Sequence, residues 1–106
     1  RFSSHLDTPV VPMEPLQAVW SQVFRQTYGG DVLGPEQRVD VMTALRAVTI
    51  DAAWQVFQED NRGSLEPGKY ADLVVLSGNP LDDPMQMRDL LVERTLVGGA
   101  TIYRRQ

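Results

Sequence analysis

The chain has 106 residues, a formal net charge of -4, 42% hydrophobic residues and 23% charged residues, which is the composition of one small globular domain. Acidic residues outnumber the scattered basic ones, no apolar run approaches the roughly 18 residues of a membrane span, and no signal peptide opens the chain, so neither nucleic acid nor a membrane is an expected partner. The absence of cysteine excludes disulfides and thiolate metal sites, and it fits a cytoplasmic location.

The first ten residues contain the single histidine of the chain, His5, two positions before Asp7. Taken alone, such a pair near a chain end is typical of a turn at the surface. The chain begins with Arg1 rather than Met, so we expect further residues to precede it in the intact protein.

A helix is predicted to begin near Pro15, because proline suits the first helical turn. Apolar side chains then recur at helical spacing: Leu16, Val19, Trp20, Val23 and Phe24. Gly29 and Gly30 are expected to end this helix. The stripe places Trp20 in the core rather than in a substrate site.

The next stretch predicts two consecutive helices. Asp40 is placed to cap the first, which would bury one apolar face: Val41, Ala44, Leu45 and Val48. Thr49 is expected to end the first helix and to cap the second. That second helix would bury a stripe of its own: Ile50, Ala53, Trp54 and Phe57. Trp54 is therefore also expected in the core.

Strands are predicted in the last third of the chain. The run Ala71–Leu76 is largely apolar, which is typical of a strand buried on both faces. After a turn or helical stretch led by Pro84, two more strands, Leu91–Val97 and Ala100–Arg104, flank a Gly-Gly pair. Two glycines at the turn allow the positive φ angles of a type I′ hairpin. The fold class of these residues is thus predicted to be α+β.

A long motif runs through this part of the chain. Residues 63–76 read GSLEPGKYADLVVL, and residues 93–104 read ERTLVGGATIYR. Together with the helix around Ala47, Thr49 and Ala53, they resemble the C-terminal part of metal-dependent amidohydrolases, namely amidohydrolase family 3, which is related to N-acyl amino acid deacylases. The resemblance implies that residues 1–60 are the last strand and closing helices of a (β/α)8 TIM barrel. Residues 61–106 would then be the C-terminal part of a composite β-sandwich subdomain.

The resemblance also gives the N-terminal pair a chemical role. In the family the last barrel strand ends in an aspartate within Ser-Asp-x-Pro-Val, and residues 7–10 read DTPV, although Leu6 replaces the serine. On a strand, His5 and Asp7 would project to the same face, toward the barrel interior. By this resemblance Asp7 binds the metal and shuttles a proton from metal-activated water to the leaving nitrogen. His5 would orient the site through a hydrogen bond or contact the substrate.

The implied cofactor is a divalent metal, with zinc expected, and the implied substrate is a small amide. A catalytic zinc site takes about three protein ligands, whereas the His-x-His of the family is not found among these residues. A complete barrel needs roughly 250 residues. We therefore expect the chain to be inactive by itself, to have the N-terminal part of the same protein as its partner, and to form a homo-oligomer.

One alternative stays open at this point. The chain could be a free-standing α+β interaction or scaffold module that keeps the scaffold of such an enzyme without its chemistry. Zinc content and amidase activity of a longer protein would separate the two hypotheses.

Overall fold

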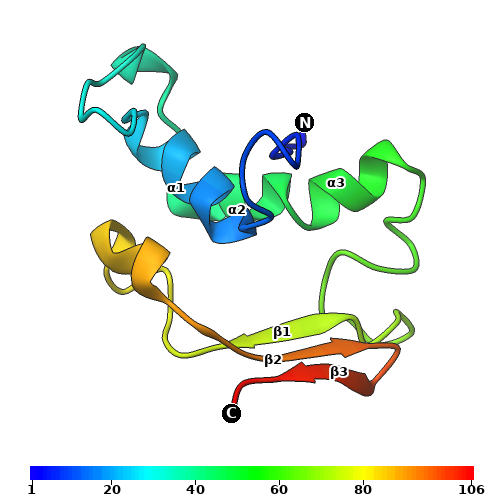
Figure 1. Ribbon diagram of the computed structural model, residues 1–106. Helices are drawn as coiled ribbons and strands as arrows, with labels where there is room; N and C mark the ends of the chain where they lie inside the picture. The colour runs from blue at the N-terminus through cyan, green and yellow to red at the C-terminus, as the bar shows by residue number, and fades with distance from the viewer.

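The computed structural model describes residues 1–106 in two layers (Figure 1). Helices α1 to α3 and the N-terminus lie on one side, and a three-stranded sheet with the C-terminus lies on the other. In chain order the elements are α1 (Pro15–Phe24), the 3₁₀ helix η1 (Pro35–Gln37), α2 (Val41–Ala47), α3 (Ile50–Gln55), β1 (Leu73–Leu76), the 3₁₀ helix η2 (Pro84–Asp89), β2 (Val92–Val97) and β3 (Ala100–Arg104). This arrangement confirms the α+β prediction. None of the helices is both long and apolar enough to cross a membrane.

Helix α1 begins at Pro15, as predicted. The predicted stop at Gly29 and Gly30 is wrong, because Arg25 already ends the helix. Arg25 adopts a left-handed φ of 55°, and its backbone N–H donates to the Ser21 carbonyl oxygen at 2.8 Å, which closes the last turn. The two glycines therefore belong to the loop that follows.

Asp40 caps α2, as predicted. Its carboxylate accepts hydrogen bonds from the Thr43 hydroxyl at 2.7 Å and from the Thr43 backbone N–H at 2.9 Å. Both bonds favour the charged form, so they lower the pKa of Asp40 below its ordinary value, the hydroxyl bond more strongly. Thr49 separates α2 from α3, also as predicted. Its hydroxyl, however, donates to the Leu45 carbonyl oxygen at 2.8 Å and does not cap α3.

The core lies between α1, α2 and η2. Val19, Ala44 and Met87 have no exposed surface, and Trp20 is almost fully buried, which confirms Trp20 as a core residue. The guanidinium carbon of Arg88 lies 3.9 Å from the centre of the Trp20 ring. Because Met87 and Arg88 both belong to η2, the segment that follows β1 returns to complete the helical layer.

The second predicted core stripe is wrong in its aromatic half. Trp54 is 43% exposed and Phe57 is 87% exposed. Phe57 lies beyond the end of α3 and has a positive φ of 58°. The backbone at Gly63 covers this face of α3 instead, so closely that a Cβ added to Gly63 would lie 2.8 Å from the Ala53 Cβ. The loop backbone, rather than two aromatic rings, therefore packs on α3.

The sheet is antiparallel, in the order β1-β2-β3. Gly98 and Gly99 join β2 to β3 with φ of 57° and 82°, which confirms the predicted two-glycine turn. The prediction that the first strand is buried on both faces is wrong, because Val74 and Val75 are 50% and 44% exposed. Strand β1 pairs with β2 along one edge only, so its other edge is open.

Candidate functional site

The N-terminal segment, residues 1–14, contains no strand. The prediction that His5 and Asp7 share one face of a strand is therefore wrong for this structure. A strand needs a neighbouring strand to satisfy its backbone N–H and C=O groups. Here the Ser4 N–H donates instead to the carbonyl oxygen of Ala47, at the end of α2, at 3.0 Å. The segment is thus held by a helix rather than by a sheet.

His5 and Asp7 are brought together by a local turn. Asp7 adopts a positive φ of 54°, and its backbone N–H donates to Nδ1 of His5 at 3.1 Å. Because Nδ1 accepts this bond, the ring proton of the neutral imidazole lies on Nε2. Both side chains are exposed. The Asp7 carboxylate and the His5 Nε2–H therefore remain available to a substrate or to water.

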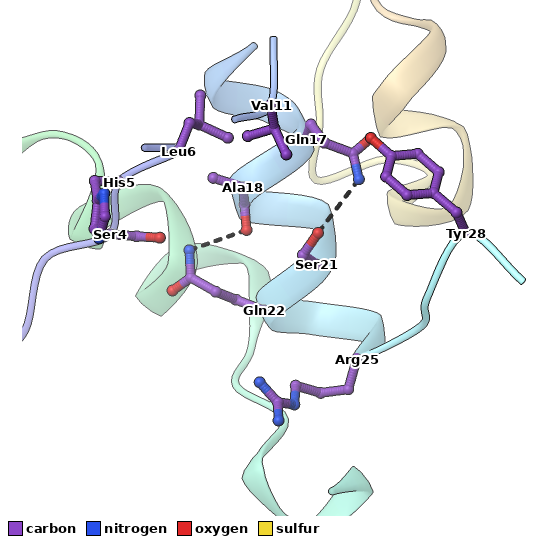
Figure 2. Close-up of a pocket in the computed structure, with 10 residues that line it drawn as sticks. All are labelled: Ser4, His5, Leu6, Val11, Gln17, Ala18, Ser21, Gln22, Arg25 and Tyr28. Carbon is purple, nitrogen blue, oxygen red and sulfur yellow. Dashed lines mark hydrogen bonds between the residues drawn. The ribbon is translucent and has the colours of Figure 1, made fainter. Parts of the chain in front are cut away.

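A hollow of about 270 Å³ lies between this segment and α1 (Figure 2). Ser4 and His5 form one wall, and Arg25 and Tyr28 lie toward the other (Figure 2). Ten residues line it: Ser4, His5, Leu6, Val11, Gln17, Ala18, Ser21, Gln22, Arg25 and Tyr28. His5 is the only ionisable side chain that the N-terminal segment contributes to this space.

The α1 wall of this hollow is polar. Gln17 Nε2 donates to Ser21 Oγ at 3.3 Å, and Gln22 Nε2 donates to the Ala18 carbonyl oxygen at 3.1 Å (Figure 2). The sequence prediction did not single out this face. The signal was present, since Gln17 and Ser21 are four residues apart and therefore share one side of the helix, apart from the apolar stripe.

A second hollow, of about 300 Å³, brings Asp7 and His5 to the same space. It is lined by residues of the N-terminal segment and of the helices: Ser4, His5, Leu6, Asp7, Thr8, Met13, Pro15, Ala18 and Val48. His5 lines both hollows, whereas Asp7 lines only this one. Asp7 and His5 therefore border one hollow in this structure.

The largest hollow, about 480 Å³, lies elsewhere, between α3 and β1. Its two charged side chains, Arg62 and Asp72, form an ion pair at 3.5 Å. Asp72 also accepts a hydrogen bond from the Gly98 N–H at 2.8 Å, which ties the hairpin turn to the start of β1. These charged groups are therefore engaged in holding the sheet and its flanking loop together.

A metal site is not formed by these residues alone. Nowhere in the chain do three or more His, Cys, Asp or Glu side chains gather in a way that could hold a metal ion. His5 and Asp7 could supply at most two ligands, fewer than the three that a catalytic zinc site usually takes from protein. The residues present therefore do not fit a complete site, and metal binding by Asp7 stays a prediction.

Comparison with known proteins identifies the family. The sequence profile of the amidohydrolase family matches residues 1–103. The chain belongs to the amidohydrolase family. It is 37% identical over 106 residues to an N-substituted formamide deformylase of Arthrobacter pascens, covering 99% of this chain and 20% of that protein. It is 30% identical over 103 residues to the putative amidohydrolase YtcJ of Bacillus subtilis, covering 93% of this chain and 20% of that protein.

A solved structure agrees with this assignment. The crystal structure of an amidohydrolase from Thermotoga maritima matches with a TM-score of 0.68 and 33% sequence identity, over 93% of this chain and 22% of that chain. The predicted resemblance to amidohydrolases is thus confirmed. This amidohydrolase chain spans about one fifth of the length of the curated relatives it matches.

Proposed function

We propose that this chain is part of a hydrolase that cleaves non-peptide carbon–nitrogen bonds of small amides. The family match over residues 1–103 carries the proposal. The name of the formamide deformylase, 37% identical to this chain, supports an amide-type substrate. Within such an enzyme, residues 1–60 would end the (β/α)8 barrel, and residues 61–106 would form the C-terminal part of a β-sandwich subdomain.

Asp7 is the residue to which we assign proton transfer. Its carboxylate is exposed and lines the 300 Å³ hollow beside His5. In the proposed reaction, Asp7 takes a proton from the attacking water as the new C–O bond forms. It then gives this proton to the leaving nitrogen as the C–N bond breaks. One carboxylate can serve both steps, because it is a base when ionised and an acid once protonated.

His5 is assigned an orienting or substrate-binding role. Its Nδ1 already accepts the Asp7 N–H at 3.1 Å, so Nδ1 is not available to remove a proton from water. The Nε2–H points away from this bond and can donate to a carbonyl oxygen of the substrate. Replacing His5 should therefore lower kcat less than replacing Asp7.

A divalent metal, zinc in our proposal, would supply the remaining activation, because a bound metal ion lowers the pKa of water and polarises a carbonyl group. Asp7 is the side chain of this chain that we assign as a ligand. The other ligands would come from the N-terminal part of the same protein, which we propose as the partner of these residues. The intact enzyme is proposed to be a cytoplasmic homo-oligomer.

The decisive experiment is Asp7→Asn in the full-length protein that contains this chain. The change keeps the size of the side chain and removes the base, so kcat for a panel of small N-substituted amides should fall by about 10²–10⁴-fold. His5→Ala should lower it by about 10–100-fold. Asp60→Asn, a change of the same kind at an exposed position without a side-chain partner, serves as the control. Near-normal turnover of Asp7→Asn would remove the assignment.

The second candidate function is a scaffold or interaction module without catalysis. Metal analysis of the purified full-length protein separates the two proposals. A stoichiometric divalent metal together with amide hydrolysis supports the enzyme, whereas a metal-free and inactive full-length protein supports the scaffold.

A further inference from the structure

Asp51 is the only polar or charged residue among the buried residues of the chain, with 7% of its surface exposed. It lies in the first turn of α3. No hydrogen-bond donor reaches its Oδ1 atom, which is also buried. A buried carboxylate without such donors is costly unless opposite charges lie close by. The charged groups near Asp51 therefore indicate which part of the chain its carboxylate holds in place.

Two arginines supply the opposite charge. Arg1 Nε and Arg46 Nη2 each lie 3.7 Å from Asp51 Oδ1. Arg46 is close in sequence, at the end of α2. Arg1 lies fifty positions before Asp51 in the sequence, so its ion pair connects the N-terminal segment to α3. Water screens this pair little on the Asp51 side, because that side chain is 9% exposed.

The neighbours of Arg1 extend the same contact. The Arg1 guanidinium lies 5.5 Å from the centre of the Trp54 ring, which gives this exposed tryptophan a partner. The Ser3 hydroxyl donates to Gln55 Oε1, and the Ser4 N–H bonds to the end of α2. Three of the first four residues are therefore fixed on α2 and α3. The next residue, His5, lines both hollows.

We propose that Asp51 is a positioning residue for the site formed by His5 and Asp7. Through Arg1, Asp51 fixes residues 1–4 on α2 and α3, and this determines the positions of His5 and Asp7. The inference rests on the proposed roles of Asp7 and His5. Asp51 touches neither of them, so it acts only through the segment. A displacement of reacting groups by about 1 Å can cost about 100-fold in rate, which is why a remote anchor matters.

The test uses four variants of the full-length protein: Arg1→Met, Asp51→Asn, the double variant, and Arg46→Met as the matched control. Arg46 pairs with the same Asp51 oxygen as Arg1 does, but it belongs to α2 and not to the N-terminal segment. Two quantities are measured for each variant. One is hydrogen exchange in residues 1–8, and the other is kcat and KM for an amide that the wild-type protein hydrolyses.

Arg1→Met and Asp51→Asn should each raise exchange in residues 1–8 by about tenfold or more, because the Ser4 N–H bond opens more often. Each should lower kcat by about 10–100-fold while KM changes by less than about threefold. The double variant should lose no more than Asp51→Asn alone, because Asp51→Asn already removes the Arg1 ion pair together with the Arg46 pair. Arg46→Met should leave kcat within about threefold of wild type.

The proposal is overturned if Arg1→Met and Asp51→Asn leave exchange and kcat at wild-type values while Asp7→Asn abolishes turnover, since the proposed function then stands without this anchor. It is also overturned if exchange rises but kcat does not fall. If Asp7→Asn is as active as wild type, the proposed function fails, and exchange alone decides whether Asp51 anchors the segment. Should Asp51→Asn fold poorly, the exposed Arg1→Met variant decides the question.

Discussion

The helical layer and the sheet of this chain bury their apolar side chains to very different extents. All eight buried residues lie in α1, α2, α3 or η2, and none lies in a strand. In the sheet, apolar side chains such as Val74, Val97 and Ile102 are at least half exposed. The helices and η2 thus complete a core within these 106 residues, whereas the strands keep apolar side chains exposed.

This difference indicates which surface of the chain the rest of the protein should cover. Because the chain spans about 20% of its curated relatives, we expect the remaining part of a full-length protein to cover the sheet and its open edge, besides completing the barrel to which residues 1–60 are assigned. The two layers should therefore respond differently to the same kind of substitution.

The largest contrast is expected between the two tryptophans. Trp20→Ala removes a ring that is 3% exposed and stacked under Arg88, so it should lower the free energy of unfolding by about 3–5 kcal/mol. Trp54→Ala removes a partly exposed ring and should cost about 1 kcal/mol. Urea unfolding of the 106-residue chain followed by circular dichroism measures both. Equal losses would show that the helical core does not close around Trp20.

The next contrast concerns two glycines in the connection between the layers. Gly63 has a φ of +92°, and an added Cβ would lie 2.8 Å from the Ala53 Cβ and 2.9 Å from the Ile50 Cα. Gly63→Ala therefore combines backbone strain with a clash and should cost about 2–4 kcal/mol. Gly68 has a φ of +95° but open space around it, so Gly68→Ala should cost only about 1 kcal/mol. The same urea experiment applies, and similar losses would mean that the loop yields at Gly63.

These contrasts show which structural features could be predicted from the sequence alone. Features set by neighbours in the chain were predictable: the apolar stripe that buries Trp20, the Asp40 cap on Thr43, and the Gly98-Gly99 turn. Each depends on residues within one or two helical turns or on a single turn conformation. The family, too, could be recognised, because its motif is a continuous run of residues.

Features set by distant residues were not predictable. Trp54 has helical spacing for a core residue, but the backbone at Gly63 takes the position beside α3. The pairing of Arg1 with Asp51 leaves no pattern in the sequence, because its members are far apart in the chain. His5 and Asp7 were predicted to project from one face of a strand, and that arrangement is wrong, because residues 1–14 form no strand and the Asp7 N–H bonds to His5 Nδ1 within a turn.

The open sheet makes a prediction about association. At rising concentration the 106-residue chain should self-associate through its strands, because unpaired apolar edges are templates for pairing. Trp20 is buried, so the α1 face should not take part. Ile102→Lys on β3 should weaken association by about tenfold, or about 1.4 kcal/mol. Val10→Lys, also well exposed but outside the sheet, is the matched control. Sedimentation velocity decides, and a monomer at every concentration would show that the exposed strands need no cover.

The smallest effect is expected at an exposed position of the helical layer, the Asp40 cap of α2. The hydroxyl and backbone bonds from Thr43 lower the pKa of Asp40 below 3.8, so its carboxylate stabilises the folded state. This contribution is present in full above the unfolded-state pKa and is lost as the pH falls through the folded-state pKa. Asp40→Ala should therefore be less stable than wild type near neutral pH, and the difference should shrink once the pH drops below 3.8.

The measurement is the urea midpoint of both proteins as a function of pH, with Glu36→Ala as the control, since Glu36 is an exposed carboxylate without a hydrogen bond in the structure. The control should lie close to wild type at every pH. A constant difference between Asp40→Ala and wild type down to the lowest pH would mean that the cap stabilises α2 without its charge. The protonated Asp40 side chain would then accept the bond from the Thr43 hydroxyl as well as the charged one does.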